Sequence, residues 1–236
     1  MKVEIWSDIM CPFCYIGKRR FENALQQFEK KNNIEVVWKS FQLNPAMKTE
    51  PGKNINQYLA DTKGWTLDYA KQMNAHVANM ANEAGLQYDF DKIVVANSFD
   101  AHRLIQLSKA NGKGDEMEER LFKAYFTEGK NTADHPTLVQ LGIEVGLDEA
   151  TITKMLSGNE YIDKVEQDIY EAQQIGVRGV PYFVLNDRYA VSGAQASQTF
   201  LDALNKAYGE WQKEKPGIKE NNGNDAAICT TEGECN

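Results

Sequence analysis

Hydrophobic and polar positions alternate in some parts of the chain and follow a helical period in others. Lys2–Ser7 alternates and carries β-forming side chains, which predicts a buried strand near the N-terminus. From Pro12 to about Lys31, apolar residues recur every three to five positions, so we expect a helix with Pro12 at its first position. Alternation returns over Ile34–Gln42. The order strand, helix, strand allows a right-handed parallel crossover.

The middle of the chain has helical periodicity and no convincing strand. A loop is expected over Asn44–Lys53, which contains two prolines and a glycine. Asp148 is expected to cap the helix that begins at position 149, and Thr132 or Asp134 the helix that begins at position 135. The predicted helices are at about 55–61, 66–84, 98–110, 115–127, 135–145, 149–156 and 160–175.

Strand patterns return near the C-terminus. Tyr182–Leu185 is a short apolar strand, and Tyr189–Ser192 is its expected hairpin partner. Ala196–Trp211 is amphipathic and predicts a last helix. From Glu214 onward large apolar residues nearly vanish, which predicts a flexible tail. One sheet must therefore be assembled from strands at both ends of the chain.

This arrangement predicts an α/β fold with an inserted all-helical subdomain. We expect a discontinuous domain formed by residues 1–43 and 176–213, an inserted helical domain at 44–175, and a tail at 214–236. Apolar residues make up 42% of the 236 positions, which is enough for a substantial core.

The net charge and the N-terminal sequence limit the kinds of binding partner and the cellular compartment that we expect. The net charge of −8 disfavours nucleic acid or an anionic membrane as the main partner, because both require clustered Lys and Arg. No apolar run approaches the length of a membrane span, and Met1 is followed at once by the first predicted strand rather than by a signal peptide. We therefore expect a cytoplasmic protein.

Two of the four cysteines, Cys11 and Cys14, lie where the first strand gives way to the first helix. Residues three apart share one face of a helix, so a disulfide between them can form and break with little backbone movement. Cys11 lies at the helix N-terminus, where unpaired N–H groups and the helix dipole stabilise a thiolate. We therefore expect Cys11 to be the nucleophile and the more buried Cys14 to be the resolving thiol.

Two other interpretations of these cysteines are weaker. A four-cysteine zinc site would need Cys229 and Cys235, which are spaced too widely for a usual zinc knuckle and lie in the tail, so no metal is expected. Inert buried thiols are the other alternative. The strand–CxxC–helix context favours redox chemistry over both.

Several segments together resemble the DsbA family of thiol–disulfide oxidoreductases, specifically its FrnE-like branch. The segments that carry this resemblance are Ser7–Gly17, which includes Cys11-Pro12-Phe13-Cys14, and 97–104, 179–183 and 192–195. The resemblance covers nearly the whole chain. It implies a thioredoxin fold with an inserted helical domain, in agreement with the order of strands and helices above.

The resemblance also implies roles for residues outside the CxxC pair. Pro181 would be a cis-proline facing the cysteines, and the backbone of Val180 would pair with an extended substrate. Pro12 and Phe13 are expected to contact substrate as well. The C-terminal pair, Cys229 and Cys235, would take part in redox exchange.

Two further residues are candidate accessory groups. By resemblance, His102 would face the active site and tune the thiolate or bind a substrate carboxylate, although a packing or surface histidine is the plainer interpretation. Gln195 precedes the last helix, whose N-terminus could hold an anionic group such as a carboxylate of glutathione. A simple helix cap is the alternative.

These observations predict a disulfide reductase or isomerase without a bound cofactor, with glutathione as a candidate co-substrate. The dipeptide Pro12-Phe13 lacks the histidine of strongly oxidising relatives, so a more reducing couple is expected. Expected partners are protein or small-molecule thiols and disulfides, with glutathione or a thioredoxin-type protein as electron donor. The alternatives are a glutathione-dependent isomerase or transferase of the kappa type, which carries serine near the position of Cys11, and a redox-sensing or chaperone-like binding module.

Overall fold

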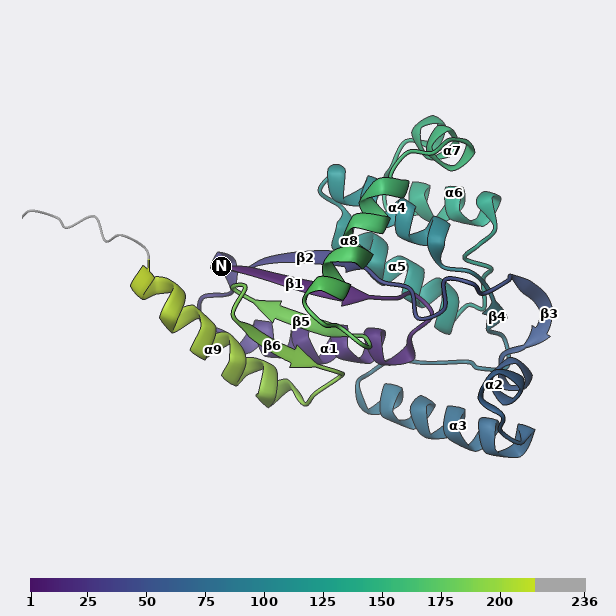
Figure 1. Cartoon of the computed structure of the whole chain (residues 1–236), viewed down its shortest axis with the longest axis horizontal. Helices are drawn as coiled ribbons and strands as arrows, with labels where there is room; N and C mark the ends of the chain where they lie inside the picture. The colour runs from purple at the N-terminus through teal and green to yellow at the C-terminus, as the bar shows by residue number, and fades with distance from the viewer. Residues whose placement is uncertain (215–236) are drawn as a thin grey trace, which may run out of the picture.

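The computed structural model describes residues 1–214 and contains a four-stranded mixed sheet in the order β2-β1-β5-β6 (Figure 1). The central strand β1 (Lys2–Ser7) is parallel to β2 (Glu35–Ser40) and antiparallel to β5 (Tyr182–Leu185). The hairpin partner of β5 is β6 (Tyr189–Ser192). The two ends of the chain thus form one sheet, as the sequence predicted.

Helices α1 (Pro12–Gln27) and α9 (Ser197–Glu214) lie side by side on one face of the sheet. Phe21 of α1, Phe183 of β5 and Phe200 of α9 are fully buried and pack with ring centroids 4.6–5.7 Å apart. Their burial fixes the position of α1, and with it the position of the cysteines at its first turn.

The opposite face of the sheet is covered by α8 (Ile162–Gln174). The carboxylate of Asp168 accepts hydrogen bonds from the backbone N–H of Ser40 at 2.9 Å and from Gln106 at 2.6 Å, while its backbone carbonyl accepts one from the indole of Trp6 at 2.9 Å. One buried residue of α8 therefore ties this helix to both parallel strands and to the helical region.

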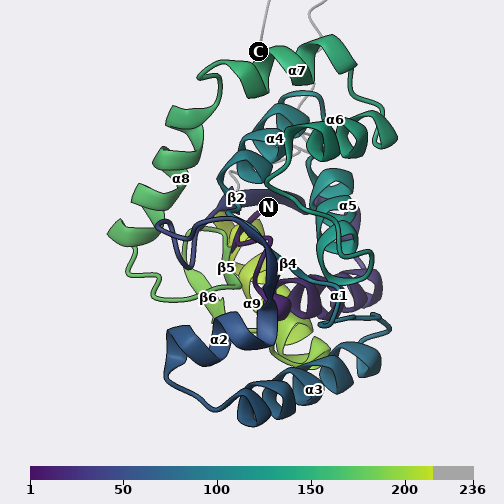
Figure 2. The same cartoon turned by 90° about the vertical axis from the view of Figure 1, so that its right-hand side faces the viewer.

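The helical region lies at one end of the sheet, and its outermost helices α2 and α3 are side by side there (Figure 2). Asp134 and Asp148 cap their helices by accepting hydrogen bonds from backbone N–H groups three residues later. The helices of this region are α2 (Ile55–Lys63), α3 (Leu67–Glu83), α4 (Phe99–Ala110), α5 (Gly114–Phe126), α6 (His135–Glu144) and α7 (Glu149–Ser157).

Two predictions about the elements were wrong. The stretch expected to be a loop followed only by helices contains β3 (Glu50–Asn54), which pairs antiparallel with β4 (Val94–Val95) across a register irregularity. Pro51 and Gly52 hid this strand, because both residues are rare inside sheets and are tolerated only in short edge strands such as this one. The first helix ends at Gln27 rather than near position 31, where a short 3₁₀ turn follows.

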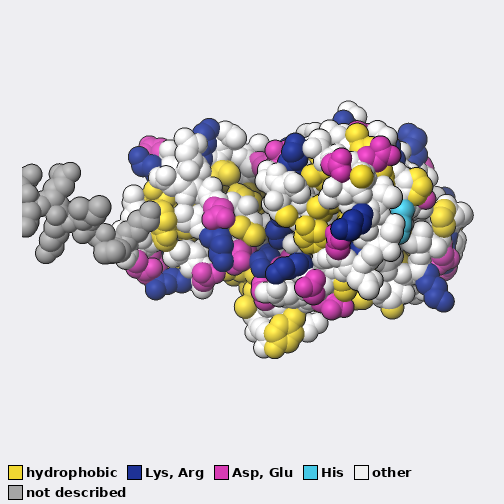
Figure 3. All heavy atoms as spheres, turned by 90° about the horizontal axis from the view of Figure 1, so that it is seen from above, with side chains coloured by type: hydrophobic (Ala, Val, Ile, Leu, Met, Phe, Trp, Pro, Cys, Tyr) yellow, Lys and Arg dark blue, Asp and Glu magenta, His cyan; other side chains and the backbone are white. Residues whose placement is uncertain are grey.

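The described surface carries charges of both signs. On the face shown in Figure 3, Lys and Arg side chains are interspersed with Asp and Glu and form no large area of one sign. Within residues 1–214, no helix is both long enough and apolar enough to cross a membrane.

Candidate active site

Cys11 and Cys14 lie at the start of α1, directly after β1 and a short connection. Cys11 is the N-cap residue, with extended backbone angles, and Pro12 occupies the first helical position. The N–H of Cys11 donates to the carbonyl of Asp8 at 2.9 Å, and the N–H of Cys14 donates to the carbonyl of Cys11 at 3.0 Å. Both cysteines are free thiols and both are buried.

The Cys11 thiol faces Val180 and Pro181, which directly precede β5. Its Sγ donates a weak hydrogen bond to the carbonyl oxygen of Val180 at 3.4 Å. The peptide bond between Val180 and Pro181 is cis, as expected. The N–H of Val180 makes no hydrogen bond within the described part of the chain. A polypeptide lying beside Cys11 could therefore pair with this backbone.

Close packing holds Pro181 against α1. A Cβ atom built at Gly17 would lie 2.8 Å from Cγ of Pro181, so only glycine allows the approach. On the other side, the N–H of Gly193 donates to the carbonyl of Pro181 at 2.8 Å. The proline is thereby held between the first helix and the turn that leads to α9.

Cys14 lies behind Cys11 and is 1% exposed. Burial raises the pKa of the Cys14 thiol well above its ordinary value, and the neighbouring Cys11 sulfur raises this pKa further. The backbone of Asp8 and the hydroxyl of Ser7 partly offset the rise. Cys14 is therefore a protonated thiol at neutral pH in this state.

A buried polar cluster, formed by Ser7, Asp8, His102 and Glu118, lies next to Cys14. The Asp8 carboxylate accepts a hydrogen bond from the N–H of Leu43 at 2.7 Å, and Nε2 of His102 is 3.4 Å from its Oδ1 without hydrogen-bond geometry. Among the described residues, Ser7 Oγ, both ring nitrogens of His102 and Glu118 Oε1 have no hydrogen-bond partner. Burial raises the pKa of Glu118 to about 7.

An aromatic stack from the helical region covers the CxxC turn. The hydroxyl of Tyr88 donates to the carbonyl of Pro12 at 2.8 Å, and its ring stacks on Phe126 and Tyr15. Tyr15 stacks in turn on Phe122, with ring centroids 4.9 Å apart. Nothing in the sequence pattern singled out Tyr88, because it follows α3 and is brought to the cysteines only by the tertiary structure.

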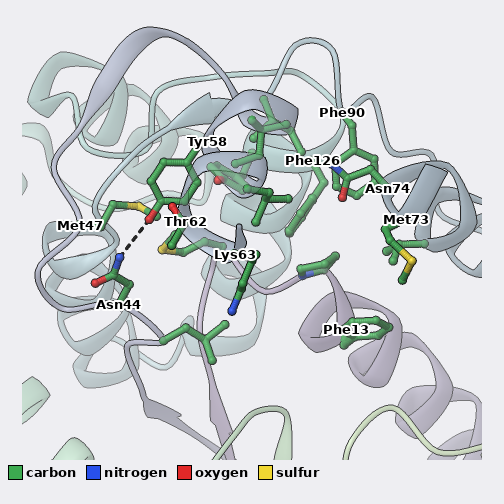
Figure 4. Close-up of a pocket in the computed structure, with 18 of the residues that line it drawn as sticks. Phe13, Asn44, Met47, Tyr58, Thr62, Lys63, Met73, Asn74, Phe90 and Phe126 are labelled. Atoms are coloured by element: carbon green, nitrogen blue, oxygen red, sulfur yellow. Dashed lines mark hydrogen bonds between the residues drawn. The ribbon is translucent and has the colours of Figure 1, made fainter. Parts of the chain in front are cut away.

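A pocket of about 540 Å³ lies beside the turn and shares Phe126 with the aromatic stack (Figure 4). Met10, Pro12 and Phe13 form the wall nearest the cysteines, and α2, α3 and α5 contribute most of the rest. Asn44, from the loop after β2, donates to the hydroxyl of Tyr58 at 2.9 Å across one wall.

The structure brings the expected substrate-contacting residues together around Cys11, and of the two accessory candidates it places only His102 in the cluster beside the cysteines. His102 is 1% exposed and lies beside Asp8, which fits the interpretation as a packing histidine and not that as a surface histidine. Gln195 is exposed, and its amide donates to the carbonyl of Ser192 at 2.9 Å within its own turn.

Two expectations bear on the remaining cysteines and on metals. Cys229 and Cys235 lie outside the described residues. Within residues 1–214, no group of three or more His, Cys, Asp or Glu side chains is arranged to hold a metal ion.

Comparison with known proteins gives matches over nearly the whole chain. The family model of the DSBA-like thioredoxin domain matches residues 2–205. The crystal structure of a probable DsbA oxidoreductase from Streptomyces coelicolor is 35% identical, with a TM-score of 0.85 over 100% of this chain and 98% of that one.

Two other similar proteins are more distant. The uncharacterized protein YwbO of Bacillus subtilis (strain 168) is 29% identical over 215 residues, which are 90% of this chain and 98% of that protein. The cytosolic disulfide reductase DsbM from Pseudomonas aeruginosa, also solved with GSH, is 17% identical with a TM-score of 0.60 over 90% of this chain and 98% of its own. At that identity the likeness to DsbM concerns the fold alone.

Proposed function

The chain belongs to the DsbA-like thioredoxin-domain family of disulfide oxidoreductases and isomerases, and on that premise we propose that it exchanges thiols and disulfides at Cys11 and Cys14. One observation carries the proposal. The Cys11 sulfur lies at the N-terminus of α1 and faces the cis-proline strand, while Cys14 is buried one turn behind it. The presence of both sulfurs argues against a kappa-type transferase.

The exchange proceeds in two steps. The Cys11 thiolate attacks one sulfur of a substrate disulfide, forming a Cys11–substrate disulfide and releasing one substrate thiolate. Cys14 then loses its proton and attacks the Cys11 sulfur, which releases the second substrate thiolate and leaves a Cys11–Cys14 disulfide. Two electrons pass from the protein to the substrate, and Val180 and Pro181 align a polypeptide substrate during the attack.

We expect the reaction to run as reduction or isomerisation. Neither Pro12 nor Phe13 is charged, so the two residues between the cysteines add no cation beside the Cys11 thiolate. The proposal also includes a cytoplasmic location, glutathione or a thioredoxin-type protein as electron donor, and membership of the FrnE-like branch. Titration of the Cys11–Cys14 couple in glutathione buffers tests the direction of the reaction. A potential of about −200 mV or lower agrees with a reductase or isomerase, and one near about −120 mV would make the protein an oxidant.

Trapping of the intermediate tests the roles of the cysteines. Cys14→Ser should accumulate a disulfide between Cys11 and a substrate thiol, because no resolving thiol is left to release it. Cys11→Ser should accumulate no disulfide between Cys14 and substrate, because Cys14 is buried. Mass spectrometry after exposure to a peptide disulfide distinguishes the two variants, and adducts on Cys14 in the Cys11→Ser variant would contradict the assignment.

The C-terminal pair, Cys229 and Cys235, is proposed as a second redox pair on the sequence alone. Single-turnover kinetics of Cys229→Ser and Cys235→Ser test this role. If both variants return the Cys11–Cys14 disulfide to dithiol at the rate of the unmodified protein, the pair is not a relay.

A further inference from the structure

The pocket beside the CxxC turn has the size and chemistry of a small-molecule site. Its volume of about 540 Å³ falls in the range of roughly 300–1,000 Å³ that is typical of such sites and exceeds the volume of a single side chain. Its floor is buried and apolar: Met47, Ile55, Val77 and Phe126 are each less than 10% exposed. An occupant must therefore insert an apolar body.

Two features of the rim limit what this body can be. Phe13 and Trp65 are more than one-third exposed although both line the pocket, which leaves aromatic surface free for stacking. Met10 and Met73 add flexible, polarisable side chains that adapt to different apolar shapes. The rim thus favours an aromatic or branched aliphatic group over a polar one.

Charge on the pocket wall favours an anion. Lys63 is the one charged residue that lines the pocket in the described part of the chain, and it has no carboxylate within 4.0 Å there. The carboxylate nearest in sequence, Asp61, is paired with Lys53 at 2.8 Å. In the view of Figure 4, Lys63 extends between Asn44 on one side and Phe13 on the other.

The pocket is also next to the reacting sulfur. Met10 and Pro12, the two residues that flank Cys11 in the sequence, both line it. Cys11 itself is 3% exposed and lies behind this wall, so a disulfide held in the pocket reaches its sulfur only when the contact between the Cys11 thiol and the carbonyl of Val180 opens.

We propose that this pocket binds one half of small organic disulfides whose halves each carry an apolar, preferably aromatic, body and one negative charge, and that it presents their sulfur atoms to Cys11. The inference rests on the proposed thiol exchange and names its substrate class. The Cys11 thiolate forms a bond with one substrate sulfur and releases the other half as a thiolate. Cys14, after losing its proton to solvent, attacks Cys11 and releases the second half, so the substrate gains the two electrons that the cysteines lose.

Binding is measured with 3-nitrobenzoate, which has the proposed aromatic body and charge but no sulfur. Nitroaromatic compounds quench nearby tryptophan, so occupancy should give saturable quenching that the Trp65→Phe variant loses. Lys63→Glu should weaken the affinity about tenfold. The matched control, Lys71→Glu, makes the same charge change on an exposed lysine of α3 outside the pocket and should leave the affinity within about twofold.

Exchange is measured in single turnovers with two disulfides. Each protein carries Cys229→Ser and Cys235→Ser and is reduced and then freed of reductant before mixing, because a free dithiol would reduce an aryl disulfide directly. The Lys63→Glu variant should lose about tenfold in the second-order rate constant for 5,5′-dithiobis(2-nitrobenzoate), yet stay within about twofold for bis(2-hydroxyethyl) disulfide, which is small and uncharged. Equal losses with Lys63→Glu and Lys71→Glu, or quenching that does not saturate, would overturn the pocket assignment. Saturable binding without reduction of either disulfide supports the pocket and contradicts the proposed thiol exchange instead.

Discussion

The carboxyl group of Glu118 is fully buried, and its Oε1 has no hydrogen-bond partner among the described residues, so its ionisation is coupled to folding. Burial raises its pKa from 4.5 to about 7, and the nearby Ser7, His102 and Lys18 only partly offset this rise. Between pH 4.5 and 7 the folded protein holds a proton that the unfolded chain has lost. Stability therefore falls as the pH rises through this window, by about 3 kcal/mol in total.

Replacing this carboxyl with an amide removes the effect. Glu118→Gln should increase the free energy of unfolding at pH 8 by up to about 3 kcal/mol and change it little at pH 4.5. Urea denaturation at pH 4.5, 6 and 8 measures the free energy of unfolding of the variant and of the unmodified protein. Glu116→Gln, an exposed neighbour on α5, serves as the control and should leave the pH dependence unchanged. If Glu118→Gln kept the pH dependence of the unmodified protein, the carboxyl would already be ionised in the folded state.

Gly17 is the second residue whose role depends on a single contact. Gly17→Ala should destabilise the protein by about 1–3 kcal/mol, because its new methyl group would meet Pro181 at 2.8 Å. This cost is expected although alanine favours helices over glycine by about 1 kcal/mol.

Gly209 provides the matched comparison for this substitution. It also lies within a helix, α9, but has no atom within 4 Å of an added Cβ. Gly209→Ala should therefore be neutral or slightly stabilising. Thermal unfolding of both variants measures the difference, and equal shifts in Tm would show that Pro181 moves away without cost.

At the scale of elements, the contact between α1 and α5 joins the sheet domain to the helical region. Lys18 of α1 is buried and pairs with Glu22, with Glu119 at 3.1 Å and with Asp115 at 3.4 Å. Burial alone would lower the pKa of Lys18, but these carboxylates outweigh it and raise the pKa. Arg19 adds a second bond to Glu119 at 2.7 Å. The site helix is thus attached to the inserted region by charge as well as by packing.

Removing the buried cation should weaken this attachment. Lys18→Met removes the cation shared by three carboxylates, two of which keep Arg19 as a partner, and we expect a loss of about 1–2 kcal/mol in the free energy of unfolding. Lys123→Met, on the exposed side of α5, should change it by less than about 0.5 kcal/mol. Chemical denaturation distinguishes the two, and a small loss with Lys18→Met would mean that water hydrates the carboxylates adequately.

At the scale of the whole molecule, α1 belongs to two hydrophobic cores. Its first turns, including Tyr15 and Ile16, pack with the helical region, whereas Phe21 and Ala24 pack with the sheet and α9. A helix shared in this way cannot lose one core without disturbing the other. We therefore expect the two regions to unfold together.

Truncations placed in the two cores test this cooperativity. Phe122→Ala in the helical region and Phe183→Ala in the sheet should each cost about 3–5 kcal/mol and shift one common transition. Far-UV and near-UV circular dichroism during urea unfolding should coincide in both variants. Two separated transitions in either variant would show that the regions unfold independently.

Local patterns in the sequence determined much of this protein. The cysteines at positions 11 and 14 need only a strand followed by a helix, so their placement could be predicted from neighbouring residues. The helices of the inserted region lie within a few residues of the predicted positions, because glycines and Asp caps mark their ends locally. The strand Glu50–Asn54 was missed because its pairing depends on Val94 and Val95, about forty residues away.

Tertiary structure alone decided the surroundings of the cysteines. Tyr88 and Glu118 come from segments more than seventy residues beyond the CxxC turn, and no local period marks them as site residues. His102 is a plain helical residue in the sequence and becomes part of the buried cluster only when α4 packs near Asp8. Burial, charge pairing and the shape of a pocket all depend on contacts with residues that are distant in the sequence. The sequence by itself therefore determined where Cys11 and Cys14 lie, and the fold decided their electrostatics and what can reach them.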